Sequence, residues 1–299
     1  MKGMISSKLT DPYFIAASVL YVLALIGLAF VSSSWWSALL LGFGVVLLSG
    51  VVLVVTDRRV PQPTTIIRPR AELWSMLIWY GLVILFATIT IANGLELVNQ
   101  FTNWFFLVLV PLGLLVLTRT RDVSLRATLR SVGLTRTGMK DALKLAVLIM
   151  PLSIPLLYIV GDQQRTAIQM IFHTPLRAGV SFLVSFVLAL LTAGFVEEFF
   201  FRGVLQSRLA ACLGSEWRGL LVAPFLFGLL HLPMYFFSPF EPTRGNLVWA
   251  VTSIITEQTV LGVLLGIVWV RTRNLTTPVL LHAFIDAIAM MSVLKVGTG

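Results

Sequence analysis

Two adjacent glutamates and an arginine form the first group of side chains that could do chemistry. Residues 194–203 read Gly-Phe-Val-Glu-Glu-Phe-Phe-Phe-Arg-Gly, so Arg202 follows Glu198 by four positions. On a helix, residues four apart share a face, whereas adjacent residues point about 100° apart. We therefore expect Glu198 to pair with Arg202. The carboxylate of Glu197 is then left free to take a proton from water as a general base.

Two histidines follow, each with a partner four residues away. Phe227 precedes His231, and His282 precedes Asp286. This spacing places each pair on one helical face. Taken alone, His231 is as well explained by a hydrogen bond to a neighbouring helix as by catalysis. His282 can donate a hydrogen bond in its neutral or charged form, and Asp286 can orient it or accept a proton.

The composition of the chain excludes a water-soluble protein. Of its 299 residues, 58% are hydrophobic and 12% are charged, and the mean hydropathy is +0.94. Soluble domains have about 45–50% apolar and about 25% charged residues. The single cysteine, Cys212, also excludes a scaffold held by internal disulfides. We therefore predict an integral membrane protein of the all-α class, a polytopic transmembrane helical bundle.

Apolar runs long enough to cross the hydrocarbon layer, which takes about 20 residues, recur along the whole chain. We expect eight or nine spans, within the runs 12–31, 36–56, 73–93, 102–118, 142–160, 179–199, 217–236, 247–270 and 277–294. The first run follows Lys2 and Lys8 as in a signal peptide. It is long and lacks a small-residue cleavage site, so we interpret it as a retained helix.

The basic residues predict the orientation of the bundle. With the N-terminus in the cytoplasm, 17 of the 22 Lys and Arg residues fall in inner segments, 4 in outer segments, and Arg202 within a helix. The inner residues are Lys2, Lys8, Arg58, Arg59, Arg68, Arg70, Arg119, Arg121, Arg126, Arg130, Arg136, Lys140, Lys144, Arg208, Arg218, Arg271 and Arg273; the outer ones are Arg165, Arg177, Arg244 and Lys295. We expect a bacterial cytoplasmic membrane with the N-terminus inside. The net charge of +9 then reflects topology and contacts with anionic lipids, not nucleic-acid binding.

We expect the chain to divide into three parts. Residues 1–118 form an N-terminal extension of transmembrane helices without a motif, and residues 142–299 form a membrane core that carries the paired polar residues. Between them, residues 119–141 are basic and cytoplasmic. In this segment Leu125, Leu129, Val132 and Leu134 recur at helical spacing, which fits an amphipathic helix on the membrane surface; a solvated loop is the alternative.

Ionisable residues inside the apolar runs are confined to the later part of the chain. Four of the 13 acids lie there: Glu197, Glu198, Glu257 and Asp286. A charged side chain at the bilayer centre costs about 2.5–3.5 kcal/mol. If the sixth helix continues to about Gly214, these groups and the histidines can converge on a hydrated cavity. We expect that cavity in the inner half of the membrane, opening inward; a structural ion-pair network is the alternative.

Together, the three pairs resemble the motifs of a known family. Glu197-Glu198-x-x-x-Arg202, Phe227-x-x-x-His231 and His282-x-x-x-Asp286 are similar to those of the CAAX protease and bacteriocin-processing (CPBP, or Abi) intramembrane glutamic endopeptidases. The resemblance covers residues 142–299. It implies an endopeptidase that cleaves a membrane-associated peptide or protein without a metal ion or other cofactor.

The resemblance also implies roles for individual residues. The catalytic residues would be Glu197, His231, His282 and Asp286, supported by Glu198, Arg202 and Phe227. Glu197 with His231 would activate a water, and His282 with residue 286 would form the oxyanion site. The family usually has Asn at this last position. An ionised Asp286 cannot donate a hydrogen bond to an oxyanion, so it is either protonated there or orients His282 instead.

Three other functions would use the same residues. Glu197, His231 and His282 could ligate zinc in a metal-dependent protease, although no His-Glu-x-x-His motif is present. The chain could instead be a non-catalytic scaffold or regulator of the same fold. A proton-coupled transporter would use Glu257 and Asp286 as relays, but the sequence lacks matched repeats. We expect Glu257 to bond to a neighbouring helix rather than line a substrate entrance. The sequence does not indicate the oligomeric state.

Overall fold

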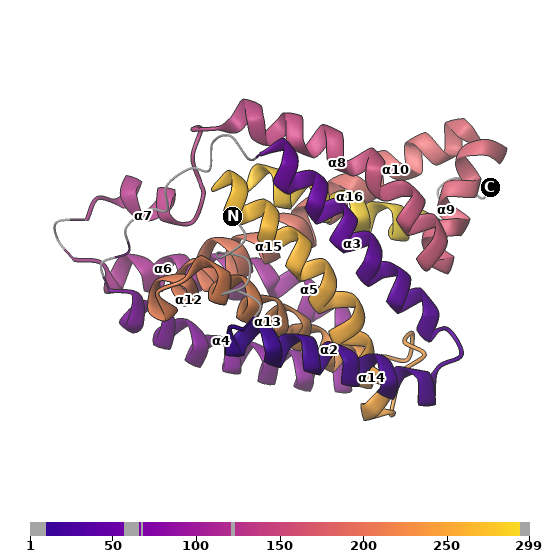
Figure 1. Cartoon of the computed structure of the whole chain (residues 1–299), viewed down its shortest axis with the longest axis horizontal. Helices are drawn as coiled ribbons and strands as arrows, with labels where there is room; N and C mark the ends of the chain where they lie inside the picture. Colours follow the sequence, from indigo (N-terminus) through magenta and orange to yellow (C-terminus); the bar gives the residue numbers. More distant parts are fainter. Residues whose placement is uncertain (1–9, 57–65, 67, 121–122, 294–299) are drawn as a thin grey trace.

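The described residues form a helical bundle. The computed structural model describes residues 10–56, 66, 68–120 and 123–293, and within these ranges there is no β-strand (Figure 1). Eight of the described helices are long and apolar enough to cross a membrane, and a shorter apolar helix, Thr276–Ser292, follows them. The predicted all-α polytopic bundle is therefore confirmed.

Each predicted apolar run lies in a helical segment to within one residue, except that residue 294 of the last run lies outside the described residues. In chain order the segments are α2 (Pro12–Val31), α3 (Trp35–Val55), α4 (Pro69–Ala92), α5 (Glu96–Trp104), η1 (Phe105–Leu109), α6 (Val110–Thr118), α7 (Leu125–Ser131), α8 (Met139–Val160), α9 (Asp162–His173), α10 (Pro175–Ala189), η2 (Leu190–Gly194), α11 (Phe195–Glu198), η3 (Phe199–Gln206), α12 (Ser207–Leu213), α13 (Glu216–Phe237), α14 (Leu247–Ser253), η4 (Ile254–Thr259), α15 (Val260–Thr272) and α16 (Thr276–Val293). The η segments are π-helical turns within longer helices.

Local sequence signals set the ends of the long helices. Pro12, Pro69 and Pro175 stand in the first turn of α2, α4 and α10, where a missing backbone N–H costs nothing. The side chain of Ser215 caps α13 by accepting a hydrogen bond from the backbone N–H of Arg218. Gly214 ends α12 with φ 64°, a left-handed conformation that glycine adopts without strain.

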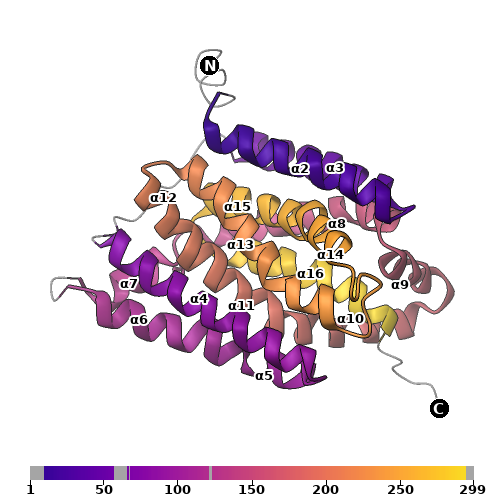
Figure 2. The ribbon, with the colours of Figure 1, turned by 90° about the horizontal axis from the view of Figure 1, so that it is seen from below.

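The bundle has two ends, which Figure 2 places left and right. The α12 end carries α7 and the last turn of α12, and the α9 end carries α9 and the first turn of α10. The helix from Pro175 to Leu213 is 39 residues long, which is about twice the roughly 20 that a bilayer needs. It therefore extends beyond one span, and the predicted continuation to Gly214 is confirmed.

The N-terminal helices pack against the later ones. On one side α3 contacts α8 and α15, and on another α4 contacts α12 and α13. Two clusters of buried apolar side chains fill the interior. One of them is built around the consecutive, fully buried residues Phe199, Phe200 and Phe201. These three side chains fix the helix that carries the two glutamates.

Two segments differ from the sequence predictions. The helix α9 was not expected; it is short and polar, and follows α8 after Gly161 alone. In the basic segment the helical alternative is confirmed for Leu125–Ser131. Val132, however, is fully buried in the core. The hydrophobic spacing there reflects packing against the bundle as well as any contact with lipid.

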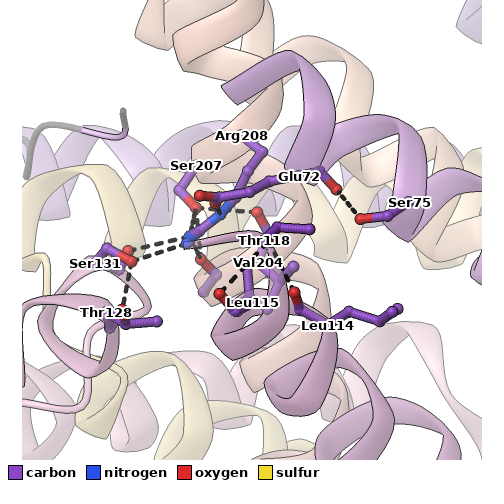
Figure 3. Close-up of polar contacts among 11 residues, drawn as sticks. Glu72, Ser75, Leu114, Leu115, Thr118, Thr128, Ser131, Val204, Ser207 and Arg208 are labelled. Atoms are coloured by element: carbon purple, nitrogen blue, oxygen red, sulfur yellow. Dashed lines mark hydrogen bonds and ion pairs between the residues drawn. The ribbon is translucent and has the colours of Figure 1, made fainter. Parts of the chain in front are cut away.

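A buried ion pair joins α4 to α12, as Figure 3 shows. Nε of Arg208 lies 2.9 Å from Oε2 of Glu72, and Arg208 also donates to the hydroxyl of Ser131 at 2.8 Å and the carbonyl of Gly203 at 3.0 Å. Arg208 was assigned above to an inner segment as a topology signal, and Glu72 was not recognised within a span. Glu72 in fact lies within α4, and the burial of each of the two residues depends on a partner from a distant helix.

Candidate active site

Glu198 lies at the centre of the polar site. Its Oε1 is 3.1 Å from Nη1 of Arg202, the pair expected from the spacing, and accepts a hydrogen bond from Nδ1 of His282 at 2.8 Å. Glu198 is 0% exposed and Arg202 is 1% exposed. Arg202 also donates to the carbonyl of Gly262 at 3.3 Å. Glu198 therefore joins the first and third sequence motifs, a link that helical spacing could not reveal.

Glu197 faces the second motif. Its Oε2 lies 3.9 Å from Nε2 of His231 and has no hydrogen-bond partner among the described residues. Nδ1 of His231 donates to the carbonyl of Phe227 at 3.0 Å, so in neutral His231 Nε2 is the unprotonated nitrogen. The distance of 3.9 Å is too long for a direct hydrogen bond. It is short enough for both groups to bind the same water.

His282 lies between two carboxylates. Its Nδ1 faces Glu198, and its Nε2 is 3.4 Å from Oδ2 of Asp286. A doubly protonated imidazole can donate to both of them, and the carboxyl group of Asp286 is placed to orient the ring. The Phe227 ring lies 5.0 Å from the ring of His231 and 5.8 Å from that of His282, with the guanidinium of Arg202 4.5 Å from its centroid. All seven residues singled out in the sequence thus lie together.

Glycines allow the helices that carry these residues to approach one another. A Cβ on Gly194 would lie 3.0 Å from the carbonyl oxygen of Val279 in α16, one turn before His282. A Cβ on Gly228 would lie 2.6 Å from Oγ1 of Thr259 in η4. Contacts this short are rarely tolerated, so these positions need glycine for close backbone packing. The π-helical segments η2 and η3 flank Glu197 and Glu198, and such segments are frequent at functional sites.

A cavity of about 280 Å³ borders His231, His282 and Asp286. Its wall also includes Gln163 of α9 and Glu241 of the loop between α13 and α14. Both segments lie at the α9 end of the bundle. The expectation of a cavity opening toward the α12 end, the side of Gly214, is therefore wrong. The error came from measuring depth along separate helices, because α9 and the loop between α13 and α14 were not foreseen as parts of the wall.

The cavity wall includes polar residues that the sequence reasoning did not place in the site. Tyr235, Glu241 and Gln258 line it, and the hydroxyl of Tyr235 donates to Glu257 at 3.1 Å. Burial raises the pKa of Glu241 above its ordinary value. The interhelical bond expected for Glu257 is present. Gln258 was considered only as a neighbour of Glu257 in a polar patch, and Tyr235 was missed because the search followed ionisable groups, although its spacing, four residues after His231, was a usable signal.

No group of three or more His, Cys, Asp or Glu side chains in the described part of the chain has an arrangement that could hold a metal ion. The set Glu197, His231 and His282 considered for zinc is therefore not assembled as ligands. The Nδ1 atom of each imidazole is bonded to a protein group, which fixes the orientation of the ring, and Nε2 of His282 faces Asp286.

The fold and the site define a polytopic helical membrane protein with a buried cluster of glutamate, histidine and arginine side chains. Residues 179–288 match the family model described as Type II CAAX prenyl endopeptidase Rce1-like. The matched segment includes every residue from Glu197 to Asp286 and is similar to this family, which confirms the resemblance to the CPBP family. Comparisons with curated proteins and with solved structures gave no match.

Proposed function

We propose that this chain is an intramembrane endopeptidase that hydrolyses a membrane-associated peptide or protein with a water activated by Glu197 and His231, without a metal ion. The observation that carries the proposal is the separation of 3.9 Å between Oε2 of Glu197, which has no hydrogen-bond partner among the described residues, and Nε2 of His231. Two adjacent proton acceptors at this distance can hold a water by both of its hydrogens. The match to a CAAX endopeptidase family supports a peptide as the substrate.

The residues of the wall also support water as the nucleophile. No serine, threonine or cysteine is among the residues that line the described cavity. In the proposed reaction Glu197 takes a proton from the water, and the water oxygen attacks the carbonyl carbon of the peptide bond. Glu197 then passes the proton to the leaving amine, so the carboxylate of Glu197 returns to its starting state.

His282 is the proposed donor to the oxygen on which negative charge grows. Glu198 binds its Nδ1, and its Nε2 points to the side of Asp286 and the cavity. Arg202 compensates the negative charge of Glu198, so this buried carboxylate has a counter-charge while it accepts the hydrogen bond from His282. We assign to Asp286 the orientation of His282, because a carboxylate would repel an oxyanion. Phe227 packs between the two histidines and keeps their rings apart.

The distribution of the basic residues supports an orientation with the α12 end in the cytoplasm of a bacterial cell. The cavity wall includes α9 and the loop between α13 and α14, so the substrate reaches the site from the outer half of the bilayer. We propose that residues 142–299 form the catalytic core and that residues 1–118 act as an extension that supports it. The packing of α3 on α8 and α15 favours this supporting role.

The test is a comparison of membrane-peptide profiles from cells that produce the wild-type chain or Glu197→Gln. We expect cleavage products in the wild-type profile that are missing with Glu197→Gln, while both proteins insert and purify equally. The matched control is Asp141→Asn, which changes a carboxyl group whose side chain is 88% exposed and outside the site. Identical profiles for wild type and Glu197→Gln would refute the proposal and favour a non-catalytic scaffold.

A further inference from the structure

A second hydrogen-bonded group shares the cavity with the histidines. The hydroxyl of Tyr235 donates to Oε2 of Glu257 at 3.1 Å and accepts a hydrogen bond from Nε2 of Gln258 at 3.0 Å. The backbone carbonyl of Tyr235 accepts from the hydroxyl of Thr243 at 2.5 Å, which ties the loop between α13 and α14 back to α13. Tyr235 and Gln258 both line the cavity that borders His231 and His282.

Two helices hold this group in place. Tyr235 lies one turn after His231 on α13, so the two side chains share a face. Glu257 and Gln258 are neighbours in η4, a π-helical segment, and both reach the hydroxyl of Tyr235. Gly228 of α13 allows η4 to pack closely against it. The orientation of the Gln258 amide is therefore fixed by a hydroxyl that is itself fixed by a carboxylate.

The amide of Gln258 keeps unused hydrogen-bonding capacity. A glutamine side chain has two N–H donors and one carbonyl oxygen. One donor is used on Tyr235, and no hydrogen bond among the described residues uses the Gln258 oxygen. In a cavity inside the membrane, a polar group without a partner is costly. A ligand that offers one donor and one acceptor side by side would satisfy both groups, and a residue in extended conformation is such a ligand, because its own N–H and C=O point the same way.

We propose that Gln258 binds the backbone N–H and C=O of one extended substrate residue beside the scissile bond, with Tyr235 and Glu257 as the residues that position it. This inference rests on the proposed endopeptidase function and adds a substrate contact to it. The Gln258 oxygen accepts the N–H of the substrate, and its second N–H donates to a substrate carbonyl. Such a contact recognises the backbone of the substrate and not its side chains, so it permits cleavage of peptides of varied sequence.

The first experiment separates binding from chemistry. The probe is a synthetic peptide that carries the sequence most strongly cleaved in the wild-type profile, presented in detergent micelles. We expect Gln258→Met, a change of similar volume, to raise KM about tenfold and to change kcat less than twofold, because a contact made equally in ground and transition states affects binding alone. Tyr235→Phe should raise KM by a smaller factor. Gln169→Met, at an exposed position outside the cavity, should change neither constant.

The second experiment removes the partner from the peptide. A series of probes replaces one backbone N–H at a time by an ester oxygen on either side of the scissile bond. We expect one replacement to raise KM about tenfold with wild type and to have no further effect with Gln258→Met. Two results would overturn this inference: an ester replacement that raises KM by the same factor in wild type and in Gln258→Met at every position, or an unchanged KM for Gln258→Met. In both cases cleavage by wild type would still support the endopeptidase. If wild type cleaves no peptide, the endopeptidase proposal fails first and this inference fails with it.

Discussion

His282 donates from Nδ1 to Oε1 of Glu198 over 2.8 Å, the same oxygen that lies 3.1 Å from Arg202. One carboxylate oxygen thus connects helices that are separated by more than 80 positions in the chain. The three charged or polar groups are almost fully buried, so each depends on the others for compensation. The pair of adjacent glutamates is divided between two tasks: Glu198 holds the structure of the site, and Glu197 faces His231.

Replacing Glu198 by glutamine should destabilise the protein. The change leaves the buried guanidinium of Arg202 without its counter-charge, and breaking a buried pair in this way typically costs about 3–5 kcal/mol. The measurement is the free energy of unfolding in mixed micelles titrated with denaturing detergent. Asp11→Asn is the control, because its pair with Arg218 is partly exposed and should contribute less than about 1 kcal/mol. Equal effects of the two changes would contradict this view of Glu198.

The ion pair between Glu72 and Arg208 should behave in the same way without involving the catalytic site. Glu72→Leu leaves Arg208 charged, buried and unpaired, and we expect a loss of about 3–5 kcal/mol in the free energy of unfolding. The double variant Glu72→Leu with Arg208→Met should recover at least half of this loss, because it removes both charges. Cleavage per folded molecule should stay unchanged. A double variant less stable than the single one would show that the other bonds of Arg208 dominate.

Asp286→Asn should preserve or increase the rate of cleavage. The Asn oxygen can still accept from Nε2 of His282, and its N–H₂ group adds a donor for the oxyanion. Asp286→Ala removes the partner of His282 and should lower kcat by 10²-fold or more, on the order of the loss of an oxyanion donor. The check is a set of steady-state constants for both variants. Equal loss in Asn and Ala variants would indicate that the carboxyl group itself takes part in the reaction.

The sequence predicts much of this site because charged side chains are rare in apolar runs. Their cost in lipid requires Glu197, Glu198, Arg202 and His282 to meet, and helical spacing identifies the pair Glu198–Arg202. Spacing on one helix says nothing about contacts between helices, so the bond from His282 to Glu198 could not be predicted. The neutral residue Gln258 gave no electrostatic signal.

The same reasoning explains why contacts near the helix ends were not predicted. Glu72 and Arg208 lie where a side chain can reach either the membrane surface or a neighbouring helix, and local sequence does not distinguish the two. The polar helix α9 is too short and too hydrophilic to be detected as a span. Its contribution to the cavity wall reversed the expected direction of opening.

Cleavage should not depend on a bound metal ion. Among the described residues, no three or more His, Cys, Asp or Glu side chains are arranged so that they could hold a metal ion, and Nε2 of His282 faces Asp286. We expect the purified protein to keep its rate of peptide cleavage, within about twofold, after dialysis against a strong chelator. The matched sample is the same preparation with zinc restored. A loss of activity that zinc reverses would favour the metalloprotease alternative.

The central claim is that Glu197 activates a water and does not itself attack the peptide. A single-turnover reaction in water labelled with ¹⁸O tests it most directly, because the attacking oxygen ends in the new carboxyl group of the product. We predict one ¹⁸O atom in the product of the first turnover with wild type, and no product with Glu197→Gln. A first-turnover product without ¹⁸O, or full cleavage by Glu197→Gln, would contradict the account.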